Sequence, residues 1–177
     1  MLGNYFDYRE FVQKIPTHLR GILRKVINAL IQKFGNKLYS VVLYGSIARG
    51  DWKPDSDIDL LIIIDDLPKS RLERQRIFSE VEKVVMKDIE SLWEKGYYHD
   101  FSPILKTPDE ARKFSPLYLD FIKDSIILFD RNSFFGEILT KLRDKLMRLG
   151  ARKIRIGKKW VWDLKPDYKW GDVIQIE

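Results

Sequence analysis

Apolar residues recur three or four positions apart through residues 17–34. This spacing places them on one stripe of an α-helix, so the pattern predicts a helix that buries the stripe against a core. Thr17 is placed to cap its start, and Gly35 ends it as glycine commonly does just past a helix. A short opening helix is expected to end near Pro16. The stripe consists of Leu19, Ile22, Leu23, Val26, Ile27, Leu30, Ile31 and Phe34.

Four other segments are rich in β-branched and apolar residues and are bounded by turn formers, a pattern typical of buried strands. A long helix is expected over Pro68–Lys95, and a capping box at Thr107 and Glu110 opens a pair of short helices. A last helix is expected over Ser133–Leu149. This order of elements predicts an α/β or α+β fold, a mixed sheet flanked by helices. The predicted strands are Leu38–Tyr44, Asp57–Ile64, Tyr97–Leu105 and Ser125–Phe129.

The segment after Gly150 is expected to be an extension of the main domain. Residues 152–164 predict a hairpin that turns at Gly157 and Lys158. The 177 residues suffice for one well-buried domain with a small appendage. We therefore expect a domain over residues 1–150 and a basic, tryptophan-containing extension over residues 151–177 within the same compact unit.

Composition excludes several protein classes. With 45% hydrophobic and 33% charged residues the chain is typical of a globular protein rather than a disordered one. Its apolar runs are too short to span a membrane, and its N-terminus lacks the pattern of a secretory signal, so we expect a cytoplasmic protein. The absence of cysteine excludes disulfides and thiolate metal sites.

The net charge of +6 is unevenly distributed. Residues 141–160 hold nine Lys or Arg and one Asp, so this window carries +8 and the remainder −2. Such a stripe is typical of proteins that bind an anionic partner, whether nucleic acid, a triphosphate or an acidic protein surface, and equally of a solvated helix face and hairpin. The tryptophans at 160 and 162 suit either stacking of RNA bases or packing of the hairpin on the core.

Gly45 and Ser46 stand where a predicted strand turns into a helix. Backbone N–H groups are unpaired there, and glycine allows a phosphate to approach them closely. The Ser46 hydroxyl is suited either to capping the helix or to donating to a phosphate oxygen. Arg49, one turn later, is able to reach the same anion or to pair with a nearby aspartate, Asp51 or Asp55.

Asp57 and Asp59 lie two residues apart in an apolar segment, so in a strand both side chains leave the same face. Two neighbouring carboxylates repel each other, and placing them in an apolar run costs stability unless a cation lies between them. The pair therefore predicts a site for a divalent metal ion.

The sequence Gly45-Ser46-Ile47-Ala48-Arg49-Gly50-Asp51, followed by Ser56-Asp57-Ile58-Asp59-Leu60, resembles the signature of the DNA polymerase beta-like nucleotidyltransferase superfamily. Its central part is similar to the minimal nucleotidyltransferases of prokaryotes, some of which act as antitoxins. The resemblance covers residues 38–65. It implies a nucleoside triphosphate at the Gly-Ser corner, contacted by Gly45, Ser46 and Arg49, and two Mg²⁺ ions held by three carboxylates.

The resemblance assigns the first two carboxylates to Asp57 and Asp59 and places the third on a later strand. Asp100 is the best-placed candidate there, with Glu94 as the alternative. All three aspartates would then be both catalytic residues and metal ligands. Neither histidine needs a role: His18 is expected to be exposed, and His99, next to Asp100, is open either to no role or to a supporting one.

Three functions remain open at this point. The resemblance favours a magnesium-dependent nucleotidyltransferase that moves a nucleotide, expected to be AMP from ATP, to a hydroxyl group of a protein, plausibly a partner toxin. A second possibility keeps the chemistry but uses a small molecule or an RNA end as acceptor. The third is a non-catalytic module that binds nucleotide or RNA.

Overall fold

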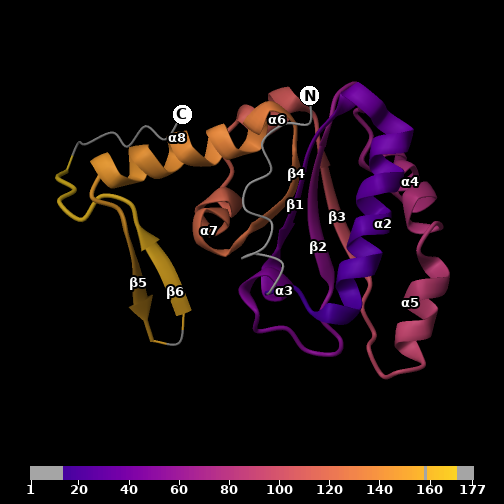
Figure 1. Cartoon of the computed structure of the whole chain (residues 1–177). Helices are drawn as coiled ribbons and strands as arrows, with labels where there is room; N and C mark the ends of the chain where they lie inside the picture. The colour runs from indigo at the N-terminus through magenta and orange to yellow at the C-terminus, as the bar shows by residue number, and fades with distance from the viewer. Residues whose placement is uncertain (1–13, 158, 171–177) are drawn as a thin grey trace.

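The computed structural model describes residues 14–157 and 159–170. Its main sheet has four strands in the order β3-β2-β1-β4 (Figure 1). β1 pairs antiparallel with β2 and with β4, while β3 runs parallel to β2. The sheet is therefore mixed, as the order of elements predicts. Its strands are β1 (Leu38–Tyr44), β2 (Ile58–Ile64), β3 (Phe101–Lys106) and β4 (Ile126–Asp130).

Helices cover both faces of this sheet, and alternate residues of β2 point to each. Leu60 and Ile62 join a core with α2, α4 and α5, whereas Leu61 and Ile63 join a second core with α7 and α8. Figure 1 shows these two sets of helices on opposite sides of the strands. The helices are α2 (Thr17–Phe34), α4 (Arg71–Glu82), α5 (Met86–Trp93), α7 (Leu117–Asp124) and α8 (Phe134–Arg148).

The helix at residues 17–34 and the strand at residues 38–44 are confirmed at their predicted bounds. The predicted cap at Thr17 is wrong, because Pro16 is the N-cap and no side chain caps this helix. The single long helix predicted over Pro68–Lys95 is wrong, since two helices, α4 and α5, occupy this segment. The first begins after Ser70, which caps it by accepting from the Glu73 N–H. The break falls at Val85, a β-branched residue whose side chain is fully buried in the first core. Two shorter helices thereby both pack on α2.

The third strand begins at Phe101, four residues later than predicted. Residues 97–100 instead lie along the loop that precedes β2. The Tyr98 N–H donates to Pro54 O at 2.7 Å, and the Ile58 N–H donates to Asp100 O at 2.7 Å. These bonds satisfy backbone groups that a longer strand would have paired within the sheet.

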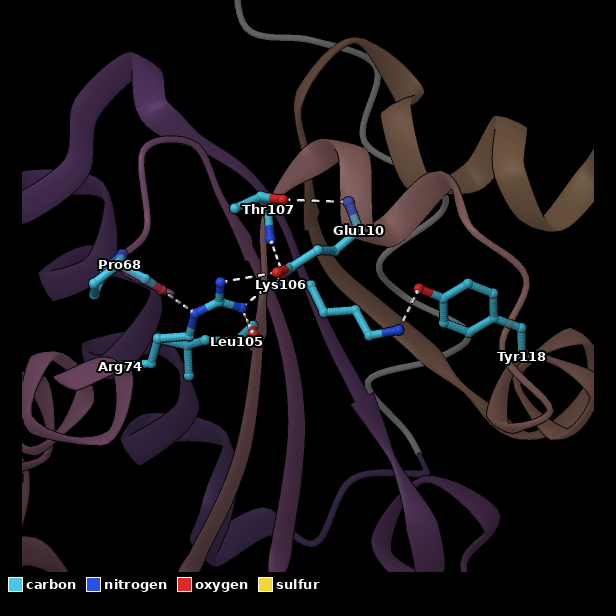
Figure 2. A network of polar contacts seen from close by, with 7 residues as sticks. All are labelled: Pro68, Arg74, Leu105, Lys106, Thr107, Glu110 and Tyr118. Carbon is cyan, nitrogen blue, oxygen red and sulfur yellow. Dashed lines mark hydrogen bonds and ion pairs between the residues drawn. The ribbon is translucent and has the colours of Figure 1, made fainter. Parts of the chain in front are cut away.

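A capping box at Thr107 opens α6 (Pro108–Arg112), as predicted. Its Glu110 also receives two hydrogen bonds from Arg74 of α4, at 2.6 and 2.9 Å (Figure 2). Arg74 further donates to Leu105 O on the edge strand β3, and Pro103 in the same strand has no N–H. Both features reduce the capacity of this edge to pair with another strand.

The predicted C-terminal hairpin is present as β5 (Arg152–Ile156) and β6 (Lys159–Asp163), which form a separate two-stranded sheet. Lys153 connects it to α7 through ion pairs with Asp120 at 3.0 Å and Asp124 at 3.6 Å. Lys158 of the predicted turn and the predicted opening helix up to residue 13 lie outside the described residues. Within the part that the structure describes, none of the helices is long and apolar enough to cross a membrane.

Candidate active site

The predicted Gly-Ser corner and carboxylate pair meet at one end of the sheet. Tyr44, the last residue of β1, lies opposite Asp59 of β2, and α3 (Gly45–Arg49) begins directly afterwards. Gly45 has a φ of +74°, a conformation that side chains disfavour. A Cβ there would collide with Asp59 Oδ2 and stand 3.0 Å from its Cγ. The structure therefore brings Gly45 and Asp59 into direct apposition.

Ser46 lies inside α3 rather than at its N-cap, which is Tyr44. The Ser46 hydroxyl therefore does not cap the helix, and donation to a phosphate oxygen is the predicted role that remains. Its carbonyl closes the following turn by accepting from the Gly50 N–H at 2.9 Å. Arg49 forms an exposed ion pair with Asp51 at 3.2 Å, which was one of the partners anticipated from the sequence.

Asp59 is the more buried of the two predicted metal ligands on this loop and strand. Burial raises the pKa of Asp59, and the negative charge of Asp57 raises it further. A hydrogen bond with Ser102 and the charge of Arg49 act in the opposite direction. A divalent cation would relieve both the burial cost and the repulsion, and oxygen ligands are those that Mg²⁺ prefers. The donor chemistry of this pair fits such an ion.

Asp100 lies immediately before β3 and level with the loop that carries Asp57. Its carbonyl holds the Ile58 N–H, while its side chain is exposed. Burial raises the pKa of Glu82 on α4, and the charge of Asp100 raises it further, so these two carboxylates are neighbours. Among residues 14–157 and 159–170, no three His, Asp or Glu side chains are grouped closely enough to hold a metal ion. The role of Asp100 as third ligand stays a prediction.

Two further residues contact the site and were not anticipated. Ser102 of β3 pairs with Asp59 in the parallel register and hydrogen-bonds its carboxylate. Burial and the charge of Asp59 raise the pKa of Tyr44 to about 12, so its phenol stays protonated. Only the register of β3 against β2 would have identified Ser102, because its sequence context is otherwise ordinary for a strand.

A small cavity of about 180 Å³ opens beside Gly45 and Arg49. Its other wall is α7, which contributes Asp120 and Asp124, the two partners of Lys153. Their spacing of four residues places both carboxylates on one helix face, a signal that was available in the sequence. A larger cavity, of about 670 Å³, is lined by Lys106 at the opposite end of β3 and lacks the carboxylate pair.

The expectation that His18 is exposed is wrong. Its ring is half-buried and its Nε2 lies 3.1 Å from Nε2 of His99. Burial and the neighbouring His99 ring lower the pKa of His18, which favours its neutral form. His99 is fully buried, and its Nδ1 lies 2.6 Å from Ser56 O, directly before Asp57. The contact between two residues 81 positions apart is not encoded in any local pattern.

Comparison with known proteins adds independent findings to this geometry. A family model described as a nucleotidyltransferase domain matches residues 23–129, which include β1, α3, β2 and β3. A candidate protein adenylyltransferase of Methanocaldococcus jannaschii, MJ1305, is 31% identical over 144 residues, which cover 80% of this chain and 92% of that protein. A second one from the same organism, MJ0435, is 36% identical over 50% of this chain and 87% of its own length.

A solved structure titled "Crystal structure of the toxin-antitoxin with AMP-PNP" is also similar. Its TM-score is 0.43 at 17% sequence identity, and the match covers 72% of this chain and 91% of that chain.

Proposed function

The chain belongs to the nucleotidyltransferase domain family and is therefore a nucleotidyl-transfer enzyme, and we propose that it uses magnesium to move AMP from ATP to a hydroxyl group of a protein. The observation that carries this proposal is the apposition of Asp59 to Gly45, with Asp57 beside it. Carboxylates that bind a metal ion thereby lie next to a corner that admits phosphate.

Asp57 and Asp59 would hold the magnesium, with Asp100 as the third ligand. When bound, this metal supplies positive charge to the triphosphate and lowers the pKa of the acceptor hydroxyl. Asp100 lies beside the same loop and would orient the acceptor or take its proton. The acceptor oxygen then bonds to the α-phosphorus, the bond from that phosphorus to the bridging oxygen breaks, and pyrophosphate leaves.

The phosphates themselves would be bound by the start of α3. Gly45 has no side chain of its own to block its backbone, although the Asp59 carboxylate lies against it, and the Ser46 hydroxyl is not used as a helix cap. Arg49 lies at the end of the same short helix and would exchange its exposed partner Asp51 for a phosphate oxygen. The small cavity beside Gly45 and Arg49 adjoins this corner and would take part of the nucleotide.

Two considerations support AMP as the group and protein as the acceptor. The relative that spans most of both chains bears the name of a protein adenylyltransferase. The motif from Gly45 to Asp51 resembles that of antitoxin-type minimal nucleotidyltransferases. On that basis we propose that the acceptor is a partner toxin protein.

The test is incubation of the protein with Mg²⁺ and α-labelled ATP in a lysate of its own host, followed by separation of proteins, RNA and small molecules. One labelled protein band is expected, and its mass would identify the acceptor. Asp57→Asn should remove the band, while Asp55→Asn, a change in the same loop, should leave it. Label confined to RNA or metabolites would replace the protein acceptor with one of those classes. Absence of label with every triphosphate would refute the transfer activity and favour a binding module.

A further inference from the structure

A chain of two hydrogen bonds joins helix α2 to the loop that carries Asp57. Nε2 of His18, in the first turn of α2, lies 3.1 Å from Nε2 of His99. Nδ1 of His99 lies 2.6 Å from the carbonyl oxygen of Ser56. The His99 side chain is fully buried, so water does not compete for either bond.

The partners define which nitrogen carries each proton. A carbonyl oxygen only accepts, so Nδ1 of His99 carries its hydrogen and donates to Ser56 O. In the neutral ring Nε2 of His99 is then an acceptor, and Nε2–H of His18 donates to it. Ser56 O thus fixes the tautomer of His99, His99 in turn fixes that of His18, and the bond between the two rings restrains the orientation of both.

Aromatic rings hold this pair in place. The His18 ring stacks on Tyr97 with centroids 4.2 Å apart and meets the edge of Trp52 at 5.4 Å. Trp52 belongs to the loop after α3, and Tyr97 to the segment before β3. The pair is therefore packed among α2, the Asp57 loop and the approach to β3, three parts of the chain that must keep one arrangement.

The Asp57 loop is held at every second residue by residues 98–100. Backbone bonds fix Pro54 O and the Ile58 N–H, and the His99 side chain fixes Ser56 O between them. The peptide group that links Ser56 to Asp57 is thus oriented by His99. A shift of this peptide would move the Asp57 carboxylate relative to Asp59, whose own position is fixed within β2.

We propose that His99 is a positioning residue that, oriented by His18, holds the Asp57 carboxylate in the geometry required to bind the divalent metal. The inference rests on the proposed function, because it assumes that Asp57 is a metal ligand. Partners that orient metal ligands in this way commonly change metal affinity by about 10–100-fold when they are removed.

The experiment compares two isosteric substitutions at this position. In His99→Asn the amide N–H lies close to the position of Nδ1. In His99→Leu the side chain has nearly the same shape as asparagine but no hydrogen-bond donor. Mn²⁺ binding to the full chain is measured by electron paramagnetic resonance, with thermal unfolding of each variant measured alongside. His99→Leu should weaken Mn²⁺ binding by about 10–100-fold, and His99→Asn should restore most of the affinity. Equal Mn²⁺ affinity in His99→Leu and the wild type would overturn the proposal.

His18→Phe provides a second test should His99→Leu fail to fold. This change keeps a ring against Tyr97 and removes only the N–H that orients His99, so weaker Mn²⁺ binding with retained folding is expected. Wild-type affinity in His18→Phe would count against the proposal. Asp57→Asn distinguishes the proposed metal site from the positioning role of His99. If Asp57→Asn binds Mn²⁺ as the wild type does, the proposed metal site fails. If Asp57→Asn loses the metal and His99→Leu keeps it, only the positioning role fails.

Discussion

The carboxylate of Asp59 fills the space that a side chain at residue 45 would need. Gly45 follows Tyr44, which lies opposite Asp59 in the antiparallel pair of β1 and β2. The glycine thus meets two requirements at once, a positive φ and the absence of a Cβ. Its presence at the Gly-Ser corner is explained by the carboxylate as well as by the phosphate that the corner is expected to bind.

Gly45→Ala should abolish transfer and destabilise the fold. The positive φ alone costs about 1–2 kcal/mol for alanine, and the collision with Asp59 adds to this and displaces the carboxylate. Gly50→Ala is the matched control, because Gly50 also has a positive φ, +87°, but a Cβ added there would have nothing within 4 Å. Urea unfolding and AMP transfer are measured for both. A Gly45→Ala enzyme as active as Gly50→Ala would contradict the apposition of Gly45 and Asp59.

Asp59→Asn should lower transfer by about 100-fold or more, as removal of one electrostatic contact to a reacting group commonly does. Its thermal stability in the absence of metal should be equal to or above that of the wild type. The reason is that the substitution removes a half-buried charge that burial and Asp57 both disfavour. Calorimetry with and without Mg²⁺ checks this, and the stabilisation by Mg²⁺ should be lost. A clear loss of stability in the metal-free variant would show that Asp59 supports the fold rather than a metal.

Asp100→Asn tests the third ligand separately. If Asp100 completes the site, transfer should fall by about 100-fold or more, with the fold retained because its side chain is exposed. Glu94→Gln, which changes the alternative candidate, should leave transfer unchanged. The reverse outcome would assign the third carboxylate to Glu94, and normal activity in both variants would mean that neither residue is required.

Local patterns predicted those parts of the fold that local interactions determine. The helix over residues 17–34, the strand over residues 38–44 and the capping box at Thr107 each depend on neighbours within a few positions. The break at Val85 was missed because α4 and α5 pack on α2 as two separate helices, a tertiary arrangement that the local pattern does not record.

The contrast between local sequence patterns and tertiary packing also applies to the candidate active site. Gly45, Asp57 and Asp59 were predicted to lie together because the motif places them within 15 residues along the chain, and the structure brings them together. Ser102 was missed because its contact with Asp59 depends on the register of β3, and the His18–His99 bond depends on how α2 docks. Sequence patterns carry the chemistry of this site, whereas the contacts that orient it arise from tertiary packing.

Glu110→Gln should destabilise the protein by about 1 kcal/mol at neutral pH, since the Arg74–Glu110 pair is partly exposed to water. Hydrogen bonding to Arg74 lowers the pKa of Glu110 below its usual value of 4.5. The charged pair therefore contributes its full stability above pH 4.5, and this contribution is lost as the pH falls through the lowered pKa. Urea unfolding should show a difference between variant and wild type that disappears in acid. Asp109→Asn, a change at an exposed neighbouring carboxylate, is the control, and a pH-independent difference for Glu110→Gln would exclude a charge effect.

Lys153→Met should loosen the C-terminal hairpin and weaken ATP binding together. The Lys153 side chain is only 20% exposed and neutralises Asp120 and Asp124, which line the cavity beside Gly45. Loss of the cation removes about 1 kcal/mol of docking energy and leaves two negative charges facing the triphosphate. Amide hydrogen exchange of β5 and β6 and the KM for ATP are the measurements.

The matched control for that change is Arg152→Gln. Arg152 pairs with Asp163 inside the hairpin, at 3.3 Å, and does not connect it to α7 through this bond. The Arg152→Gln substitution should therefore leave the KM for ATP unchanged. A higher KM in Lys153→Met alone would place the carboxylates of α7 beside the nucleotide, because Lys153→Met leaves Asp120 and Asp124 without this cation and Arg152→Gln does not. An equal KM in both would mean that the carboxylates of α7 lie beyond the reach of the bound triphosphate, and the cavity beside Gly45 would then not be part of the nucleotide site.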